Sequence, residues 1–136
     1  MIEAHHIFKT YDDTRILKDI SFSLKAAEIV SIVGPSGAGK TTLLQILGTL
    51  DKPDKNPKTR FTIDQTDMLS LSDRALSTFR NSTLGFVFQS HQLLLEFSAV
   101  ENICMPALIK GVNQKDANKR ALELLDYFGL ADRAKH

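Results

Sequence analysis

The spacing of hydrophobic residues changes several times along the chain, and each spacing predicts a different element. Two stretches, residues 1–11 and 16–24, look like strands joined by a polar turn. In the second stretch the apolar side chains of Ile20, Phe22 and Leu24 alternate with serines. Such alternation is typical of a strand with one buried face. We therefore expect an antiparallel β portion at the N-terminal end.

Two short runs, residues 29–33 and 84–88, are apolar almost without interruption. Runs of this kind indicate strands that are covered on both faces, as in a parallel sheet. Residues 61–63 predict a further strand. After the first run, residues 43–50 are apolar around much of the circumference of a helix, so we expect this helix to be buried.

Further helices follow along the chain. Ser72 can cap a short helix that ends near residue 81, and Ser98 with Glu101 forms the S-x-x-E pattern of a capping box before a second one. Residues 114–128 predict a third helix, which Gly129 ends. The residues expected on the inner side of this third helix are Ala117, Ala121, Leu124, Leu125 and Phe128.

The segment between residues 29–33 and the first helix matches the pattern G-x-x-x-x-G-K-[ST]. In such a loop, backbone N–H groups and the helix N-terminus form a positive site for phosphate. Lys40 is expected to reach the β- and γ-phosphates, Thr41 to bind Mg²⁺ and Thr42 to contact the α-phosphate. The alternative is an ordinary glycine-rich turn before a helix. The candidate nucleotide-contacting residues are Gly34, Pro35, Ser36, Gly37, Ala38, Gly39, Lys40, Thr41 and Thr42.

The composition of the chain limits the size of its core and the partners that it is expected to bind. With 136 residues, 43% of them hydrophobic, the chain can build one domain with a real core. A net charge of +1 gives no electrostatic reason to expect binding to nucleic acid. No segment approaches the roughly 20 apolar residues that span a bilayer, so a role in transport would need separate membrane subunits.

The chain resembles the ATP-binding subunits of ABC transporters over nearly its whole length. The likeness is carried by Tyr11, the phosphate loop, Gln89 in Gly85-Phe-Val-Phe-Gln89 and the run Val100-Glu-Asn-Ile103. Within the family the sequence is most similar to the lipoprotein-releasing type. The residues that carry this closer likeness are 80–81, 84–89, 91–94, 96–97, 101–103 and 105–109.

The resemblance implies an α/β fold: a P-loop nucleotide-binding core with an N-terminal antiparallel β portion and the start of an α-helical subdomain. Residues 1–89 would belong to the core and residues 90–136 to the helical subdomain. It also implies binding of ATP and Mg²⁺. Tyr11 would stack on adenine, Thr41 and Gln89 would bind the metal, and Lys40 and Gln89 would act in catalysis.

The resemblance further implies a location and partners. The family works at the cytoplasmic face of the inner membrane, as a peripheral subunit bound to transmembrane permease subunits and to a second copy of itself. We expect residues 89–109 to face the membrane partner, since Leu93, Leu94, Leu95 and Phe97 form an apolar cluster there. The alternative is that this cluster packs inward.

The family's signature motif and its Walker B strand, with the catalytic carboxylate, are not found in residues 1–136. We therefore expect an incomplete ABC ATPase domain that binds nucleotide without turnover of its own. Two alternatives stay open within this interpretation: an ATPase of the macrolide- or peptide-export type, and a non-catalytic nucleotide-binding fragment. A P-loop kinase acting on a metabolite ranks below both, because it has no reason to carry Tyr11 and Gln89 together.

Overall fold

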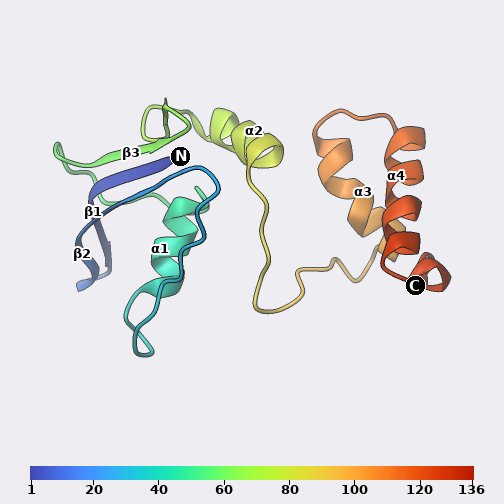
Figure 1. Ribbon diagram of the computed structural model, residues 1–136, viewed down its shortest axis with the longest axis horizontal. Helices are drawn as coiled ribbons and strands as arrows, with labels where there is room; N and C mark the ends of the chain where they lie inside the picture. The colour runs from blue at the N-terminus through green and yellow to red at the C-terminus, as the bar shows by residue number, and fades with distance from the viewer. The chain divides into compact units, whose positions relative to one another are not determined.

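The computed structural model describes every residue from Met1 to His136 (Figure 1). The chain forms two compact units, Met1–Arg80 and Asn81–His136, which we call the first and second units. The elements are β1 (Ile2–Tyr11), β2 (Thr14–Leu24), α1 (Lys40–Leu47), β3 (Arg60–Ile63), β4 (Thr66–Asp67), α2 (Asp73–Thr83), α3 (Ala99–Ile109), α4 (Gln114–Tyr127) and the 3₁₀ turn η1 (Ala131–Arg133).

The first unit is built on a four-stranded antiparallel sheet in the order β2-β1-β3-β4. In the central strand, Ala4 lies opposite Phe22 of β2 and Phe61 of β3. This register puts the apolar side chains of neighbouring strands on one face, where they can pack together. The predicted N-terminal antiparallel portion and the strand near residues 61–63 are confirmed. β4 was not predicted because two residues carry no periodicity.

The core of the first unit lies where α1 packs beside β2 (Figure 1). Leu43 and Ile46 of α1 are buried, whereas Leu44, on the other side of the helix, is 56% exposed. The prediction that this helix is buried is therefore confirmed for one side and wrong for the other. The buried apolar residues of this unit are Ala4, Ile7, Leu17, Leu43, Ile46, Phe61, Ile63, Met68 and Leu76.

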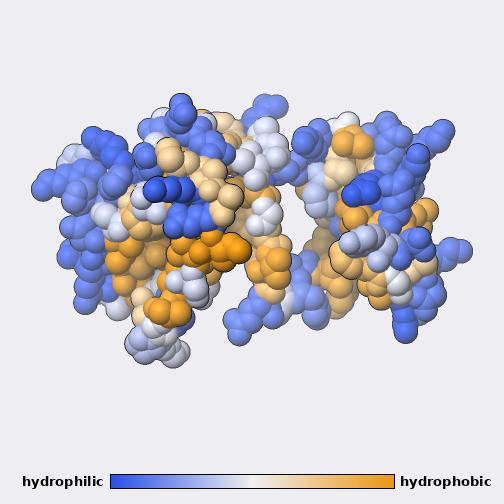
Figure 2. Space-filling model, viewed as in Figure 1, coloured by the Kyte–Doolittle hydropathy of each residue, from blue (hydrophilic) through white to orange (hydrophobic).

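The two continuous apolar runs do not form strands. Residues 29–33 and 84–88 have no regular secondary structure, and Ile29 is 98% exposed while Val87 is fully exposed. A strand exists only with a hydrogen-bonded neighbour, and neither run pairs with the four strands of the sheet. The sequence-based prediction of two buried parallel strands is thus wrong for this structure. Apolar side chains consequently reach the surface, where Figure 2 shows hydrophobic patches.

The second unit is a pair of helices, α3 and α4, packed side by side (Figure 1). Their contact is made by small residues, Cys104 of α3 and Ala117 and Ala121 of α4, which allow the two backbones to approach closely. The capping box predicted for α3 is present: the Ser98 hydroxyl accepts from Glu101 N–H, and the Glu101 carboxylate accepts from Ser98 N–H.

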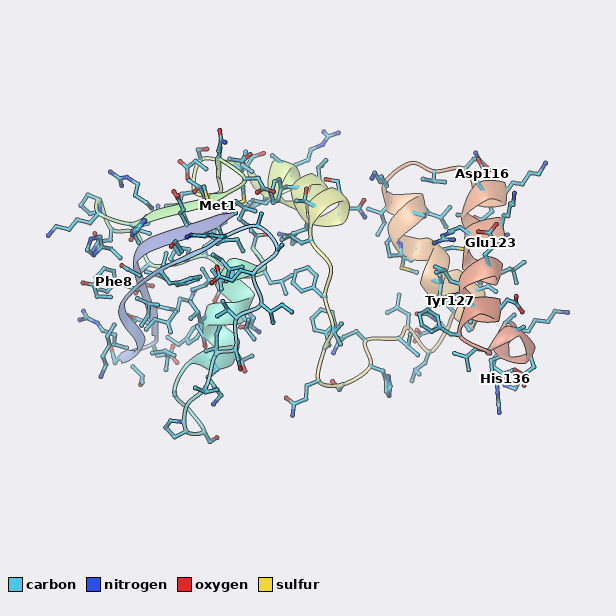
Figure 3. The ribbon with its side chains drawn as sticks, viewed as in Figure 1. Met1, Phe8, Asp116, Glu123, Tyr127 and His136 are labelled. Carbon is cyan, nitrogen blue, oxygen red and sulfur yellow. The ribbon has the colours of Figure 1, made fainter.

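The end of α4 differs in one respect from the expectation. Gly129 has a φ of +69° directly after the last helical turn, so the predicted stop is confirmed. Phe128, however, is 69% exposed rather than inward-facing, and it packs edge-to-face on Tyr127 with ring centroids 5.1 Å apart. Figure 3 places Tyr127 near the C-terminal end of α4 and Asp116 in its first turn. Phe128 is exposed because α4 ends at Tyr127, one residue earlier than expected, so Phe128 lies outside the helical periodicity.

The helix that Ser72 begins, α2, is also confirmed: the Ser72 hydroxyl accepts a hydrogen bond from Ala75 N–H at 3.3 Å. Among the helices of the structure, none has the length and hydrophobicity that crossing a lipid bilayer requires.

Candidate functional site

Gly39 connects the phosphate loop to α1 in a conformation that disfavours any residue with a side chain. Its φ is +84°, in the left-handed region that side chains disfavour. A Cβ atom at this position would lie 2.9 Å from Leu17 Cδ2 and 3.0 Å from Ile16 Cγ2, both on β2. The glycine of the G-x-x-x-x-G-K motif therefore serves two purposes: it turns the chain into the helix, and it lets the loop lie against the hairpin.

The N-terminus of α1 presents backbone donors. The Leu43 N–H makes a 2.9 Å hydrogen bond to the Gly39 carbonyl oxygen, which closes the first turn of the helix. The N–H groups of Lys40, Thr41 and Thr42 precede that bond and have no partner within the helix. Gly39, as the N-cap, offers no side chain to accept from them. These groups and the helix dipole make the end of α1 suited to bind an anion.

A cavity of about 330 Å³ opens at this end of α1. None of the residues that line it is acidic, and its polar side chains are hydroxyls and one ammonium group. This set of donors fits a polyanion such as a nucleotide phosphate chain. The lining residues are Tyr11, Ile16, Ser36, Gly37, Gly39, Lys40, Thr41 and Thr42.

The structure thus brings Tyr11 together with much of the predicted phosphate loop. Gly34, Pro35 and Ala38 belong to the same loop but do not line the cavity. Ile16 was missed by sequence reasoning. It lies two residues after β2 begins, and nothing in the local pattern distinguishes it from a residue of the strand's buried face. The roles of the lining residues in nucleotide binding stay predictions.

The Lys40 side chain folds back over its own loop. Its Nζ donates to the carbonyl oxygens of Gly34 at 2.9 Å and Pro35 at 2.7 Å. Ala38 N–H also donates to the Pro35 carbonyl, at 3.3 Å. Lys40 therefore ties the start of the loop to the first residue of α1.

Tyr11 lies at the end of β1 and is 42% exposed. Its hydroxyl donates a 2.6 Å hydrogen bond to Asp51 Oδ2, and this bond raises the pKa of Tyr11. Burial acts to raise the pKa of Asp51, but the hydrogen bonds from Lys9 and Tyr11 outweigh it, and the net pKa is lowered. Sequence reasoning missed Asp51, because its partner lies far away along the chain.

Gln89 belongs to the second unit and is exposed, whereas Lys40 belongs to the first. Its predicted position at the end of a strand is not found, because residues 84–88 do not form one. The roles of Gln89 in catalysis and in metal binding stay predictions.

Asn102 of α3 holds the apolar segment that precedes the helix. Its Oδ1 accepts from Leu94 N–H at 2.9 Å, and its Nδ2 donates to the carbonyl oxygens of Leu94, Phe97 and Ser98 at 2.9–3.1 Å. One side chain thereby fixes both backbone groups of Leu94. The segment keeps its apolar side chains outward: Leu93, Leu94, Leu95 and Phe97 are all exposed. The alternative in which this cluster packs inward is not found in the second unit.

Replacing Asn102 by Ala is expected to free this segment while leaving α3 folded. The Leu94 N–H loses its partner, and a hydrogen bond of this kind contributes about 1 kcal/mol, so its amide exchange should become about five- to tenfold faster. Hydrogen exchange followed by NMR would measure the rate. Gln92→Ala, an exposed change in the same segment, serves as the control. An unchanged exchange rate of Leu94 in Asn102→Ala would contradict the role of Asn102 in holding this segment.

Comparison with known proteins identifies the family to which the chain belongs. A sequence profile described as ABC transporter matches residues 17–136. The chain belongs to this family. It is 53% identical over 136 residues to the lipoprotein-releasing system ATP-binding protein LolD of Bacteroides thetaiotaomicron, and 49% identical to the LolD protein of Porphyromonas gingivalis. Each match covers the whole chain and 61% of the relative, so the chain spans less than two thirds of the relatives' length.

Solved structures agree on the fold. The structure superposes on the ATP-binding cassette MJ0796, in a dimeric post-hydrolysis state bound to ADP and Pi, with a TM-score of 0.87 and 35% sequence identity. A second dimeric structure of MJ0796 gives the same TM-score at 36% identity. Both alignments cover all of this chain and 61% of the other. The predicted fold class, an N-terminal portion of the ABC ATPase fold, is confirmed.

Proposed function

We propose that this chain is the N-terminal part of the ATP-binding subunit of an ABC transporter that drives lipoprotein release. The observation that carries the proposal is the cavity at the N-terminus of α1. It combines the phosphate-loop donors of Gly39, Lys40 and Thr41 with an aromatic ring, Tyr11, and has no acidic group in its lining. A nucleoside triphosphate needs this pairing of an anion site with a flat apolar surface. The LolD relatives support the assignment to lipoprotein release.

Each residue has a chemical role in the proposal. Lys40 and the loop N–H groups neutralise the phosphates, the Thr41 hydroxyl holds Mg²⁺, and the Tyr11 ring stacks on adenine. Gln89 contributes a second metal contact and senses the γ-phosphate. No residue in the cavity lining can act as a general base toward water. We therefore expect the described residues to bind ATP without hydrolysing it, and the reaction to need the catalytic carboxylate of the complete family domain.

The organisation of the complete protein is also part of the proposal. Residues 1–89 belong to the ATP-binding core, and residues 90–136 begin the helical subdomain. The exposed apolar runs at residues 29–33 and 84–88 are proposed to become parallel strands when they gain neighbours in the complete sheet. Their exposure in this structure supports this, because such runs are stable in water only when covered.

The proposed partners are transmembrane permease subunits and a second copy of the ATPase, at the cytoplasmic face of the inner membrane. The dimeric cassette structures support the second copy. The exposed cluster of Leu93, Leu94, Leu95 and Phe97 supports a contact with another protein, since exposed apolar patches often mark interfaces.

Replacing Phe97 by Glu is expected to abolish co-purification of the complete ATPase with its membrane subunits. A charge in the centre of an apolar contact loses the burial of the ring and leaves an unpaired carboxylate. ATP binding should be unchanged, because Phe97 does not line the phosphate-loop cavity. Leu122→Glu, which adds the same charge at an exposed apolar position of α4 outside residues 89–109, is the control. Normal co-purification of Phe97→Glu would contradict the proposed interface.

The alternative of a macrolide- or peptide-export ATPase predicts a different cellular result. If the protein drives lipoprotein release, its depletion should leave lipoproteins in the inner membrane. If it drives export, depletion should raise sensitivity to the exported compound and leave the distribution of lipoproteins unchanged. Membrane fractionation after depletion therefore separates the two functions.

A further inference from the structure

Two charged residues, Asp51 and Lys9, hold the Tyr11 ring. The ring lines the cavity, but neither charged residue does. The Tyr11 hydroxyl donates a 2.6 Å hydrogen bond to Oδ2 of Asp51. Asp51 does not line the cavity, and it lies in the connection that follows α1. This bond joins the end of β1 to the far end of the helix that carries the phosphate loop.

The second oxygen of the Asp51 carboxylate is fixed by other donors. Oδ1 accepts from the Lys9 ammonium at 2.7 Å and from Lys52 N–H at 2.7 Å. The same ammonium donates to the Lys52 carbonyl oxygen at 2.7 Å. Because these donors hold Oδ1, the carboxylate presents Oδ2 to Tyr11 in one orientation. Lys9 is 12% exposed and Asp51 28% exposed, so solvent screens this ion pair less than a pair on the open surface.

Lys9 also acts on the aromatic ring directly. Its Nζ lies 4.9 Å from the centroid of the Tyr11 ring, within the range of a cation–π interaction. The ring is thus held at its hydroxyl by Asp51 and over its face by Lys9. The raised pKa of Tyr11 is consistent with a strong hydrogen bond from the neutral hydroxyl to the carboxylate.

Asp51 is in turn attached to α1. The backbone N–H groups of Leu50 and Asp51 both donate to the carbonyl oxygen of Gln45, at 2.8 and 3.2 Å. Gln45 lies in α1, and the first turn of the same helix carries the phosphate-binding N–H groups. The Tyr11 ring and the phosphate site are therefore both attached to the same rigid element, α1.

We propose that Asp51 is a positioning residue that fixes the Tyr11 ring for stacking on the nucleotide base, with Lys9 as its counter-ion. This rests on the proposed function, since it takes the cavity to be a nucleotide site. Asp51 acts through Tyr11 and touches no part of the phosphate loop. Its contribution is therefore confined to the base end of the ligand, and a ligand without a base should not sense it.

Two probes, ATP and inorganic tripolyphosphate, separate the base end from the phosphate end. Each is titrated with Mg²⁺ into the intact protein and into Asp51→Ala, and the affinity is measured by calorimetry. We expect Asp51→Ala to bind ATP about three- to tenfold more weakly, the range for a side chain that must be ordered on binding. Tripolyphosphate should bind as to the wild type. Equal losses for both probes would overturn the proposal, because they would show a general effect on the phosphate loop.

Two further variants provide an independent measurement and a control. Tyr11→Phe removes the same hydrogen bond from the other side and keeps the ring, so it should show the same loss for ATP alone. The double variant should be no weaker than either single variant, because both remove one interaction. Asp54→Ala is the matched control: it removes a nearby carboxylate that acts on Tyr11 through charge alone, and it should bind both probes normally.

The outcomes distinguish this inference from the proposed function. Wild-type protein that binds neither probe would overturn the proposed nucleotide site itself. Wild-type protein that binds ATP, with Asp51→Ala and Tyr11→Phe binding it equally well, would overturn only the positioning role. If Asp51→Ala does not fold, as judged by circular dichroism, Tyr11→Phe with the two probes decides the question.

Discussion

Replacing Lys40 by Ala is expected to weaken ATP binding by about tenfold or more. Lys40 carries the one cationic side chain in the cavity lining, and a hydrogen bond from a charged group to phosphate contributes about 1.5–3 kcal/mol. A loss of 1.4 kcal/mol corresponds to a factor of about ten in affinity. Tripolyphosphate binding should fall in parallel, because the lost contact is at the phosphate end. Titration calorimetry at equal fold content measures both.

The matched control for this variant is Lys18→Ala, which removes an exposed lysine of β2 that does not line the cavity. It lowers the net charge of the protein by the same amount and should leave both affinities unchanged. Comparing the two variants therefore separates a specific contact from general electrostatic attraction. If Lys40→Ala bound ATP as tightly as Lys18→Ala, the assignment of the phosphate site would be wrong.

The second large effect is expected for Gly39→Ala, compared with Gly37→Ala. Both glycines have a positive φ, +84° and +78°, so each substitution places a side chain in the left-handed region at a cost of about 1–2 kcal/mol. A Cβ atom at Gly37 would meet nothing within 4 Å, whereas one at Gly39 would come within 2.9 Å of the buried Leu17. Overpacking of this kind adds about 1–3 kcal/mol.

The free energy of unfolding should therefore fall more for Gly39→Ala than for Gly37→Ala, and the difference isolates the contact with β2. Urea unfolding followed by circular dichroism provides the measurement. Nucleotide affinity should fall with it, because the buried Leu17 side chain has little room to yield and the loop then moves away from the hairpin. Equal destabilisation of the two variants would show that backbone strain alone matters, and that the close packing of Gly39 on β2 has no energetic consequence.

Local patterns in the sequence were sufficient for most of the helices and for the hairpin. The capping box at Ser98 and Glu101 and the stop at Gly129 are decided by residues within a few positions of each other, and both are found. The prediction of strands at residues 29–33 and 84–88 was wrong for the opposite reason. Whether an apolar run becomes a strand depends on a neighbour elsewhere in the chain, and periodicity contains no information about that neighbour.

The candidate site divides in the same way. The phosphate loop could be predicted because its chemistry depends on a fixed spacing from Gly34 to Thr41. Asp51 could not be predicted, because it lies 40 positions from Tyr11 in the sequence and the two side chains meet only in the folded chain. Asn102 lies close in sequence to the segment that it holds, yet its role depends on the helix first placing its side chain beside Leu94.

The way in which Lys40 closes its own loop changes what a binding measurement means. The ammonium group already has two acceptors, the carbonyl oxygens of Gly34 and Pro35, so only one of its three N–H donors is free for phosphate, and any further contact must replace a bond to the loop. The heat released on binding should therefore be smaller than the strength of the new contacts would indicate. It also follows that Lys40→Ala alters the free protein, because the loop loses its internal tie. The measured loss of affinity will then contain the entropy of ordering a loosened loop, in addition to the lost attraction for phosphate.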